Sequence, residues 1–227
     1  RTEKDFLGEV KIEDSQYYGV QTVRAMSNFP ITGQSIRPEL ITALAQVKYG
    51  CAAANMATGR LDTTIGNALL QACQEILDGK MRDQFPTDCI QGGAGTSINM
   101  NINEVITNRA LEILGYAKGS YDIISPNNHA NMAQSTNDAF PSAVRLAILA
   151  MTDCLLEQLH ATKASFEKKG AEFQNVLKMG RTHLQDAVPI TMGQEFLAYA
   201  EVVGRAIRRI QNAAENLYSL NMGATAV

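Results

Sequence analysis

Three short polar segments carry the side chains best suited to chemistry, and the first of them spans residues 91–97. It contains Gly92, Gly93 and Gly95, then Thr96, and a helical pattern follows directly. Glycines permit a tight turn whose N–H groups point inward, and the start of a helix adds partial positive charge. These features predict a cradle for an anion, although the lysine of a phosphate-binding P-loop is missing. A turn followed by an ordinary helix cap is the simpler alternative.

The second segment, residues 134–138, opens a long helical pattern with Ser135, Thr136, Asn137 and Asp138 in succession. Each of these residue types is favoured at the position that caps a helix. One cap needs one such residue, so the succession leaves hydroxyl and amide groups to spare. We expect the spare groups to bind a carboxylate without adding charge. The alternative is that the segment only caps the helix.

The third segment, residues 180–187, places Thr182 and His183 near an aspartate. A histidine in such surroundings can carry a proton or, as a cation, bind a carboxylate. A histidine that only makes structural hydrogen bonds is the alternative. The other two histidines, His129 and His160, are interpreted as a loop residue and a helix spacer. Because the three histidines are widely scattered, we expect no metal site.

Hydrophobic spacing predicts the elements that must hold these segments. Apolar residues three and four apart are typical of a helix, and alternation is typical of a strand. Pro38 suits the first turn of a helix, and Asp62 suits the cap of another. The predicted helices span residues 38–51, 62–77 and 102–114, followed by two long ones at 139–173 and 193–220. A loop from about 170 to 192 is predicted between the long helices, and short strands at 6–12 and 17–20.

Helices of about thirty residues are much longer than the average helix and are typical of bundles. The predicted fold class is therefore mainly α, with a small mixed N-terminal domain followed by the first long helices of a helical bundle. We assign residues 1–135 to a mostly helical N-terminal domain with a minor strand element. Residues 136–227 are predicted to form the first part of the central bundle, which we expect to continue in a longer protein.

The composition excludes several classes of protein. Of the 227 residues, 45% are hydrophobic, which is enough for a core and excludes wholesale disorder. A net charge of −3 argues against a nucleic-acid-binding protein, which would carry a basic surplus. No window is expected to reach the length of a membrane span, and the charged N-terminus is unlike a signal peptide, so we expect a cytoplasmic protein. Only 19% of the residues are charged, which suggests that some surface is buried between subunits.

In their order and spacing, the three segments resemble the fumarase/aspartase superfamily, and the resemblance covers the whole chain. The matching residues read Gly92-Gly93-Ala94-Gly95-Thr96-Ser97, Gln134-Ser135-Thr136-Asn137-Asp138 and Gly180-Arg181-Thr182-His183-Leu184-Gln185-Asp186. Class II fumarases usually read Gly-Ser-Gly-Thr-Gln in the first segment and Ser-Ser-Asn-Asp in the second. They also carry His-Pro-Asn where this chain has Ser125-Pro126-Asn127. All three differences favour the aspartase branch.

The resemblance implies a lyase that reversibly eliminates ammonia from L-aspartate to give fumarate, without an organic cofactor. The residues that it implies at the substrate are Thr96, Ser135, Thr136, Asn137, Thr182 and His183. In the family, hydroxyls hold one carboxylate, the position of Asn137 lies near the amino group, and those of Thr182 and His183 contact the other end. The base that removes the Cβ proton is a serine on a mobile loop, which we expect beyond residue 227. His183 is therefore assigned to substrate positioning.

The resemblance also implies a homotetramer with active sites shared between chains, which binds a small dicarboxylate and neither nucleic acid nor membrane. Asn137 and His183 lie near the starts of two successive long helices. We expect those helices to be antiparallel, so the two residues would meet only between chains. The 227-residue chain alone is then expected to be inactive. Two alternatives stay open: a class II fumarase acting on malate and fumarate, and a non-catalytic helical scaffold of the same fold.

Overall fold

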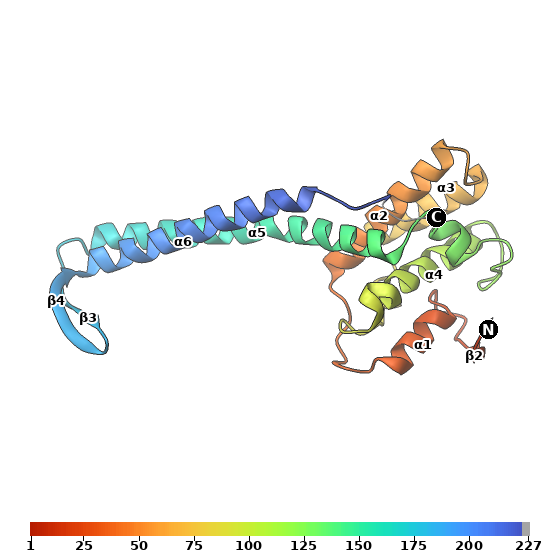
Figure 1. The fold of residues 1–227 in the computed structure, drawn as a ribbon, viewed down its shortest axis with the longest axis horizontal. Coiled ribbons are helices and arrows are strands. Elements are labelled where there is room, and N and C mark those ends of the chain that lie inside the picture. The colour runs from red at the N-terminus through yellow and green to blue at the C-terminus, as the bar shows by residue number, and fades with distance from the viewer. Residues whose placement is uncertain (224–227) are drawn as a thin grey trace. The chain divides into compact units, whose positions relative to one another are not determined.

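The computed structural model describes residues 1–223 and is mainly helical, as the sequence predicts (Figure 1). Its contacts divide the chain into two compact units. The first comprises Arg1–Ala147 together with the segment that begins at Leu220, and the second comprises Ile148–Ser219. The boundary that the sequence suggests, between residues 135 and 136, coincides with the start of a long helix, whereas the compact units divide inside that helix.

The first unit begins with a β-hairpin. Strand β1 (Thr2–Asp5) pairs antiparallel with strand β2 (Gly8–Lys11). Strand β2 lies within the strand predicted at residues 6–12, while β1 has no counterpart in the prediction. The turn between the strands exposes two large apolar side chains, Phe6 and Leu7.

The strand predicted at residues 17–20 is wrong, because helix α1 (Val20–Asn28) begins there. The reason is tertiary. Glu3 and Glu104 place buried carboxylates at this point, and their oxygens accept the N–H groups that start the helix. Local sequence preference for a strand is overridden by these contacts.

Helices α2 (Pro38–Ala57), α3 (Thr63–Leu77) and α4 (Thr96–Ile113) form the core of the first unit. Two predicted helix starts are confirmed. Pro38 occupies the first turn of α2, and the Asp62 side chain accepts hydrogen bonds from two backbone N–H groups that open α3, at 2.9 and 3.1 Å. Fully buried apolar side chains fill the space between these helices: Leu44, Leu69, Ile76, Ile102, Val105 and Leu111.

Helix α4 starts six residues before the predicted helix at 102–114. Its first turns are rich in asparagine, so they show no apolar face in the sequence. Asn99, Asn101 and Asn103 are nevertheless buried, because other elements satisfy part of their hydrogen bonding: the Asn131 side chain for Asn99 and Asn103, and the Gln84 backbone carbonyl for Asn101. Short helical turns complete the connections, at Arg82–Gln84, Gly93–Gly95, Asn216–Tyr218 and a π-helical turn at Pro126–Ala130.

Helix α5 (Thr136–Glu172) begins in the first unit and continues into the second, where helix α6 (Met192–Glu215) runs beside it (Figure 1). The two long helices confirm the bundle pattern in the sequence. Aromatic rings hold them together near one end: the Phe166 ring lies 6.2 Å from the Phe196 ring and 5.7 Å from the Tyr199 ring, measured between centroids.

The loop predicted between the long helices is wrong, since the chain forms an antiparallel hairpin there. Strand β3 (Leu177–Thr182) pairs with strand β4 (Gln185–Thr191). The connecting residues, His183 and Leu184, have φ values of 50° and 61°. Positive φ at both central residues is the requirement of a type I′ turn, which matches the twist of paired strands. Neither residue is the Asn, Asp or Gly that this turn usually carries, which explains why the sequence does not reveal the turn.

Helix α5 corrects the expectation that no window reaches the length of a membrane span. It contains an 18-residue window of mean hydropathy 1.5, of which 22% is buried inside the chain. By length and composition alone this helix could cross a membrane. A single helix of this kind is weak evidence, because the core helix of a soluble bundle has the same composition.

Candidate active site

The second polar segment forms a helix cap that uses only part of its side chains. The Ser135 hydroxyl accepts a hydrogen bond from the Asn137 N–H at 3.1 Å, and the Asp138 carboxylate accepts one from the Ser135 N–H at 2.9 Å. This reciprocal pair is a capping box, with an aspartate in place of the usual glutamate. The cap therefore needs Ser135 and Asp138, and leaves the side chains of Thr136 and Asn137 for other purposes.

Thr136 and Asn137 present different chemistry. The Thr136 hydroxyl accepts a hydrogen bond from the Asn99 amide at 3.2 Å and is half-buried. The Asn137 side chain is exposed, and within residues 1–223 it makes no hydrogen bond. Its backbone carbonyl accepts a hydrogen bond from the Asn221 amide at 2.6 Å. Among residues 1–223, the segment therefore offers a side-chain amide without a hydrogen-bond partner at the start of a helix.

The first polar segment is a left-handed turn that packs against the first turns of helix α5. Gly93, Ala94 and Gly95 have φ values of 75°, 50° and 94°. A Cβ atom on Gly95 would lie 2.4 Å from the Phe140 ring, so only glycine fits against helix α5 at this point. The turn brings the starts of α4 and α5 together within one chain.

Thr96 follows this turn as the first residue of α4. Its hydroxyl donates a hydrogen bond to the Gly93 carbonyl at 2.6 Å. It also lines an open pocket of about 290 Å³ between the β1–β2 turn, α1 and α4, together with Arg24 and Phe29. Residues of the second segment do not line this pocket. Thr96 and Asn137 thus come from neighbouring helix starts and face different surroundings in this chain.

The third segment lies in the second unit, at the tip of the β3–β4 hairpin. Thr182 ends β3, His183 is in the turn, and both side chains are exposed. Arg181 and Asp186 form an ion pair across the hairpin at 3.5 Å, also exposed. A non-glycine residue held at positive φ, as His183 is, often marks a functional position.

Sequence analysis missed a buried lysine beneath the second segment. Lys48 of α2 is 1% exposed, and its ammonium nitrogen donates to the side-chain oxygens of Asn131 at 2.9 Å and Gln134 at 2.8 Å. Burial lowers the pKa of Lys48 to about 7, against the opposing influence of the Cys51 and Cys73 thiols and the Asp138 carboxyl. A lysine inside an apolar helical pattern is the only sequence signal that points to it.

Asparagines of α4 extend the same network. Asn99 and Asn103 each donate a hydrogen bond to the Asn131 oxygen at 3.2 Å, so this oxygen receives three donors. The spacing of four residues puts both asparagines on one face of α4, and a polar pair at that spacing in a buried helix could have revealed them. The side-chain oxygens of Asn99 and Asn103 are buried and find no partner within residues 1–223.

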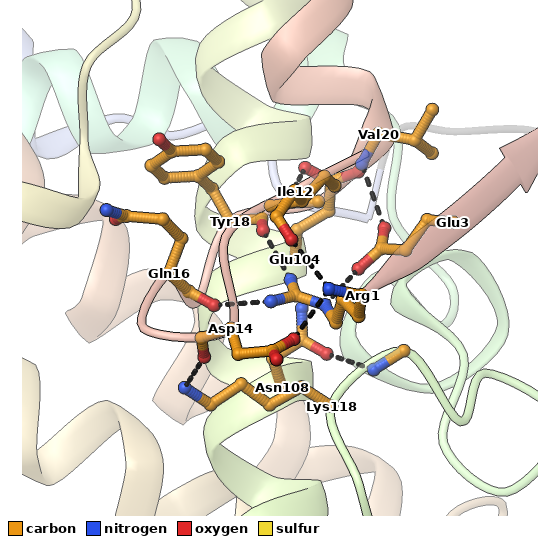
Figure 2. Close-up of polar contacts among 12 residues, drawn as sticks. Arg1, Glu3, Ile12, Asp14, Gln16, Tyr18, Val20, Glu104, Asn108 and Lys118 are labelled. Atoms are coloured by element: carbon orange, nitrogen blue, oxygen red, sulfur yellow. Dashed lines mark hydrogen bonds and ion pairs between the residues drawn. The ribbon is translucent and has the colours of Figure 1, made fainter. Parts of the chain in front are cut away.

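Two buried carboxylates organise the start of helix α1 (Figure 2). Glu104 accepts the backbone N–H groups of Gly19, Gln21 and Thr22 at 2.8, 2.8 and 3.1 Å, and the Thr22 hydroxyl at 2.7 Å. Glu3 accepts the Val20 N–H at 2.9 Å and pairs with the Arg1 guanidinium at 2.8 Å. Burial raises the pKa of Glu104 to about 7, although the hydrogen bonds that it accepts favour the ionised form and lower the pKa.

All four N–H groups that open α1 are therefore satisfied by side chains from other elements, and the negative charges complement the helix dipole. Helix α1 carries Arg24 to the pocket beside Thr96, where Asp5 holds its guanidinium at 2.6 and 2.7 Å. Among the described residues 1–223, no group of three or more His, Cys, Asp or Glu side chains is placed to hold a metal ion.

Long helices with polar residues at their starts form the framework of the candidate site, and comparison with known proteins shows which family has this framework. The model of a protein family described as lyase matches residues 8–227. The chain belongs to this lyase family. An aspartate ammonia-lyase from a Bacillus species is 59% identical over 227 residues, which is all of this chain and 48% of that protein.

Solved structures agree with this assignment. A protein from Brucella melitensis described as fumarate lyase:delta crystallin, bound to cobalt, is 48% identical with a TM-score of 0.95, over 100% of this chain and 50% of its own. A class II fumarase from Schistosoma mansoni is 35% identical with a TM-score of 0.90, over 100% of this chain and 48% of its own. The chain spans about half the length of the relatives it matches.

Proposed function

We propose that the full-length protein containing this chain reversibly eliminates ammonia from L-aspartate to give fumarate. The observation that carries the proposal is the second segment, where Ser135 and Asp138 complete the helix cap and leave Thr136 and Asn137 available to a substrate. The identity of 59% to an aspartate ammonia-lyase over the whole chain supports the same reaction.

The reaction needs groups that stabilise negative charge. Removal of a proton from Cβ gives an aci-carboxylate, and cleavage of the C–N bond then releases ammonia and leaves fumarate. Donors that are fixed before the reaction stabilise such an anion by roughly 3 kcal/mol each. In the proposal, the hydroxyls of Thr96, Ser135 and Thr136 hold one carboxylate and the Asn137 amide holds the amino group. Thr182 and His183 hold the other end of the substrate.

The catalytic base is proposed to lie on a serine-bearing loop beyond residue 227. His183 is exposed at the tip of a hairpin. Among residues 1–223, no acidic side chain bonds to it and would orient it as a base. The residues present can therefore bind and orient L-aspartate, and we expect residues 1–227 alone to form no fumarate. Neither a metal nor an organic cofactor has a role in the proposal.

We propose further that the protein is a cytoplasmic homotetramer with active sites shared between chains. Exposed apolar side chains on α5 and α6 support assembly with other copies. Thr96 and Asn137 face different surroundings in this chain, which supports a site completed by neighbouring chains.

Purified full-length protein tests the reaction directly. Fumarate formation is followed by its absorbance, with L-aspartate in one assay and L-malate in another. We expect fumarate from L-aspartate only. Fumarate from L-malate alone would establish the fumarase alternative, for which the similarity to the Schistosoma mansoni enzyme is the specific support. No fumarate from either substrate would favour a non-catalytic scaffold.

Mixing two variants of reduced activity tests the shared site. Asn137→Ala and His183→Asn each remove one binding group, and asparagine suits the left-handed turn position of His183. The two variants are unfolded together and refolded as mixed oligomers. If each site takes these two residues from different chains, some sites then contain both the wild-type Asn137 and the wild-type His183. We expect partial activity in the mixture. A mixture no more active than the average of its two parents would show that each site comes from one chain.

A further inference from the structure

We propose that Lys48 is a positioning residue, which through Gln134 and Asn131 fixes the segment that ends in Thr136 and Asn137. Its effect on turnover rests on the proposed function. Its effect on the order of the segment does not, and the experiment below measures the two separately.

The placement of Lys48 is costly and therefore needs an explanation. The side chain lies inside the first unit, where burial disfavours its charged form. Its two hydrogen-bond partners are neutral amide oxygens, so no ion pair offsets the loss of hydration. A neutral amine has two N–H donors, which matches these two acceptors. An apolar side chain of similar volume would fill the same space without this cost.

Both partners lie in the short connection between the π-helical turn and α5. Asn131 uses its amide oxygen for Lys48 and its amide nitrogen for the Gln134 carbonyl at 3.0 Å. Gln134 uses its amide oxygen for Lys48 and its nitrogen for the carbonyls of Ala130 at 3.1 Å and Met132 at 3.3 Å. Lys48 therefore closes a ring of hydrogen bonds and orients both amides.

This ring is joined directly to the candidate site. Ser135 follows Gln134 in the chain and caps α5, and Asn99 links the Asn131 oxygen to the Thr136 hydroxyl. When Lys48 loses its amine, the Gln134 oxygen loses its donor, and only the hydrogen bonds of its amide nitrogen still orient the side chain. The start of α5, including Asn137, then loses one of its fixed supports.

The experiment compares Lys48→Met in the full-length protein with wild type and with Lys80→Met, which removes an exposed lysine of the same unit. Hydrogen–deuterium exchange is measured for the peptide that covers residues 134–138, and kcat and KM are measured for L-aspartate. For Lys48→Met we expect exchange about 10-fold faster and kcat/KM about 10- to 100-fold lower, by analogy with residues that orient a ligand-binding group. Lys80→Met should match wild type in both.

A double-mutant cycle separates positioning from a general loss of stability. If Lys48 acts through Gln134, the losses in kcat/KM for Lys48→Met and Gln134→Leu do not multiply in the double variant. Losses that multiply would overturn the link through Gln134. If Lys48→Met does not fold, Gln134→Leu breaks the same hydrogen bond from its other end and is tested in its place.

The result is judged on Lys48→Met, or on Gln134→Leu if Lys48→Met does not fold. Unchanged hydrogen exchange at residues 134–138, together with kcat/KM within twofold of wild type, would overturn the proposal. If wild type forms no fumarate from L-aspartate, the proposed function fails and the exchange rates alone decide the proposal for Lys48. Faster exchange confined to this segment would then still support it.

Discussion

At the scale of single residues, the polar segment at the start of α5 divides structural and chemical roles between neighbours. Ser135 and Asp138 satisfy the backbone at the helix start, whereas the Asn137 side chain is exposed and uncommitted within residues 1–223. A run of cap-forming residues in a sequence does not reveal which one caps the helix. Because the structure does, the two roles can be tested separately.

Asn137→Ala should reduce turnover without reducing stability. The lost amide removes a hydrogen bond to the substrate, so we expect kcat/KM for L-aspartate to fall by an amount equivalent to about 1–3 kcal/mol. Asp138→Ala is the matched variant for the cap, because Asp138 accepts the Ser135 N–H and is not among the proposed substrate-binding residues. It should lower the free energy of unfolding by about 1–3 kcal/mol. Steady-state kinetics and thermal melts measure both effects. A lower melting temperature for Asn137→Ala with unchanged kcat/KM would return Asn137 to a structural role.

Lys48 should make stability depend on pH above neutrality. The folded amine loses its proton near pH 7, whereas the unfolded chain keeps it to about pH 10.5. Between these values the unfolded state binds more protons than the folded state, so the free energy of unfolding rises with pH. The stabilisation that comes from the lowered pKa of Lys48 is complete above pH 10.5 and is lost as the pH falls through 7. From pH 7 to 9 we expect a gain of about 2 kcal/mol relative to Lys48→Met. Urea unfolding at both values measures it, and parallel behaviour of the two proteins would contradict it.

At the scale of elements, helix α1 shows how distant contacts determine secondary structure. Its first four N–H groups bond to Glu3 and Glu104, which are far away in the sequence. The helix in turn carries Arg24 toward the pocket that Thr96 lines. The carboxylates therefore support one side of the candidate site through the helix that they cap.

Glu104→Ala should destabilise this helix strongly. The change leaves three backbone N–H groups and the Thr22 hydroxyl without their acceptor, and buried donors without partners are costly. We expect the free energy of unfolding to fall by roughly 3 kcal/mol or more, with faster amide exchange over residues 20–28. Glu9→Ala, at an exposed position of β2, should stay within about 0.5 kcal/mol of wild type. Equal melting temperatures for the two variants would show that the cap contributes little.

At the scale of the whole molecule, the second unit exposes apolar surface that a single chain does not cover. Ile148, Met151 and Leu155 lie on one face of α5 at helical spacing, and each is between 38% and 49% exposed. Contiguous apolar surface of this kind marks an interaction site. In the proposed homotetramer, neighbouring copies cover it and complete the active sites.

Leu155→Glu in the full-length protein should therefore weaken assembly and activity together. A charge on this face must lose its hydration when the copies associate, so we expect smaller species in light scattering after size exclusion, and lower turnover in the same fractions. His160→Glu adds a negative charge at an exposed position on the other side of α5 and should leave both unchanged. A tetramer with full activity for Leu155→Glu would place this face outside the interface.

The sequence by itself determined the features that depend on neighbouring residues. The cap at Asp62, the proline start of α2 and the long helices all follow from local spacing and local hydrogen bonding, and the structure confirms them. The three polar segments are likewise read from local sequence, and their role at the substrate stays a prediction. The sequence also identifies the lyase family, because the three short polar segments resemble it and the family model matches residues 8–227.

Only the tertiary structure decided the features that depend on distant partners. Residues 17–20 look like a strand until Glu104 reaches the N–H groups there, and Lys48 looks like one exposed lysine among many until Asn131 and Gln134 enclose it. The sequence does not show the hairpin at His183 for a related reason, since strand pairing imposes a turn that lacks the usual Asn, Asp and Gly. In each case the free energy of a long-range contact exceeds the local preference, and a sequence pattern records only the local one.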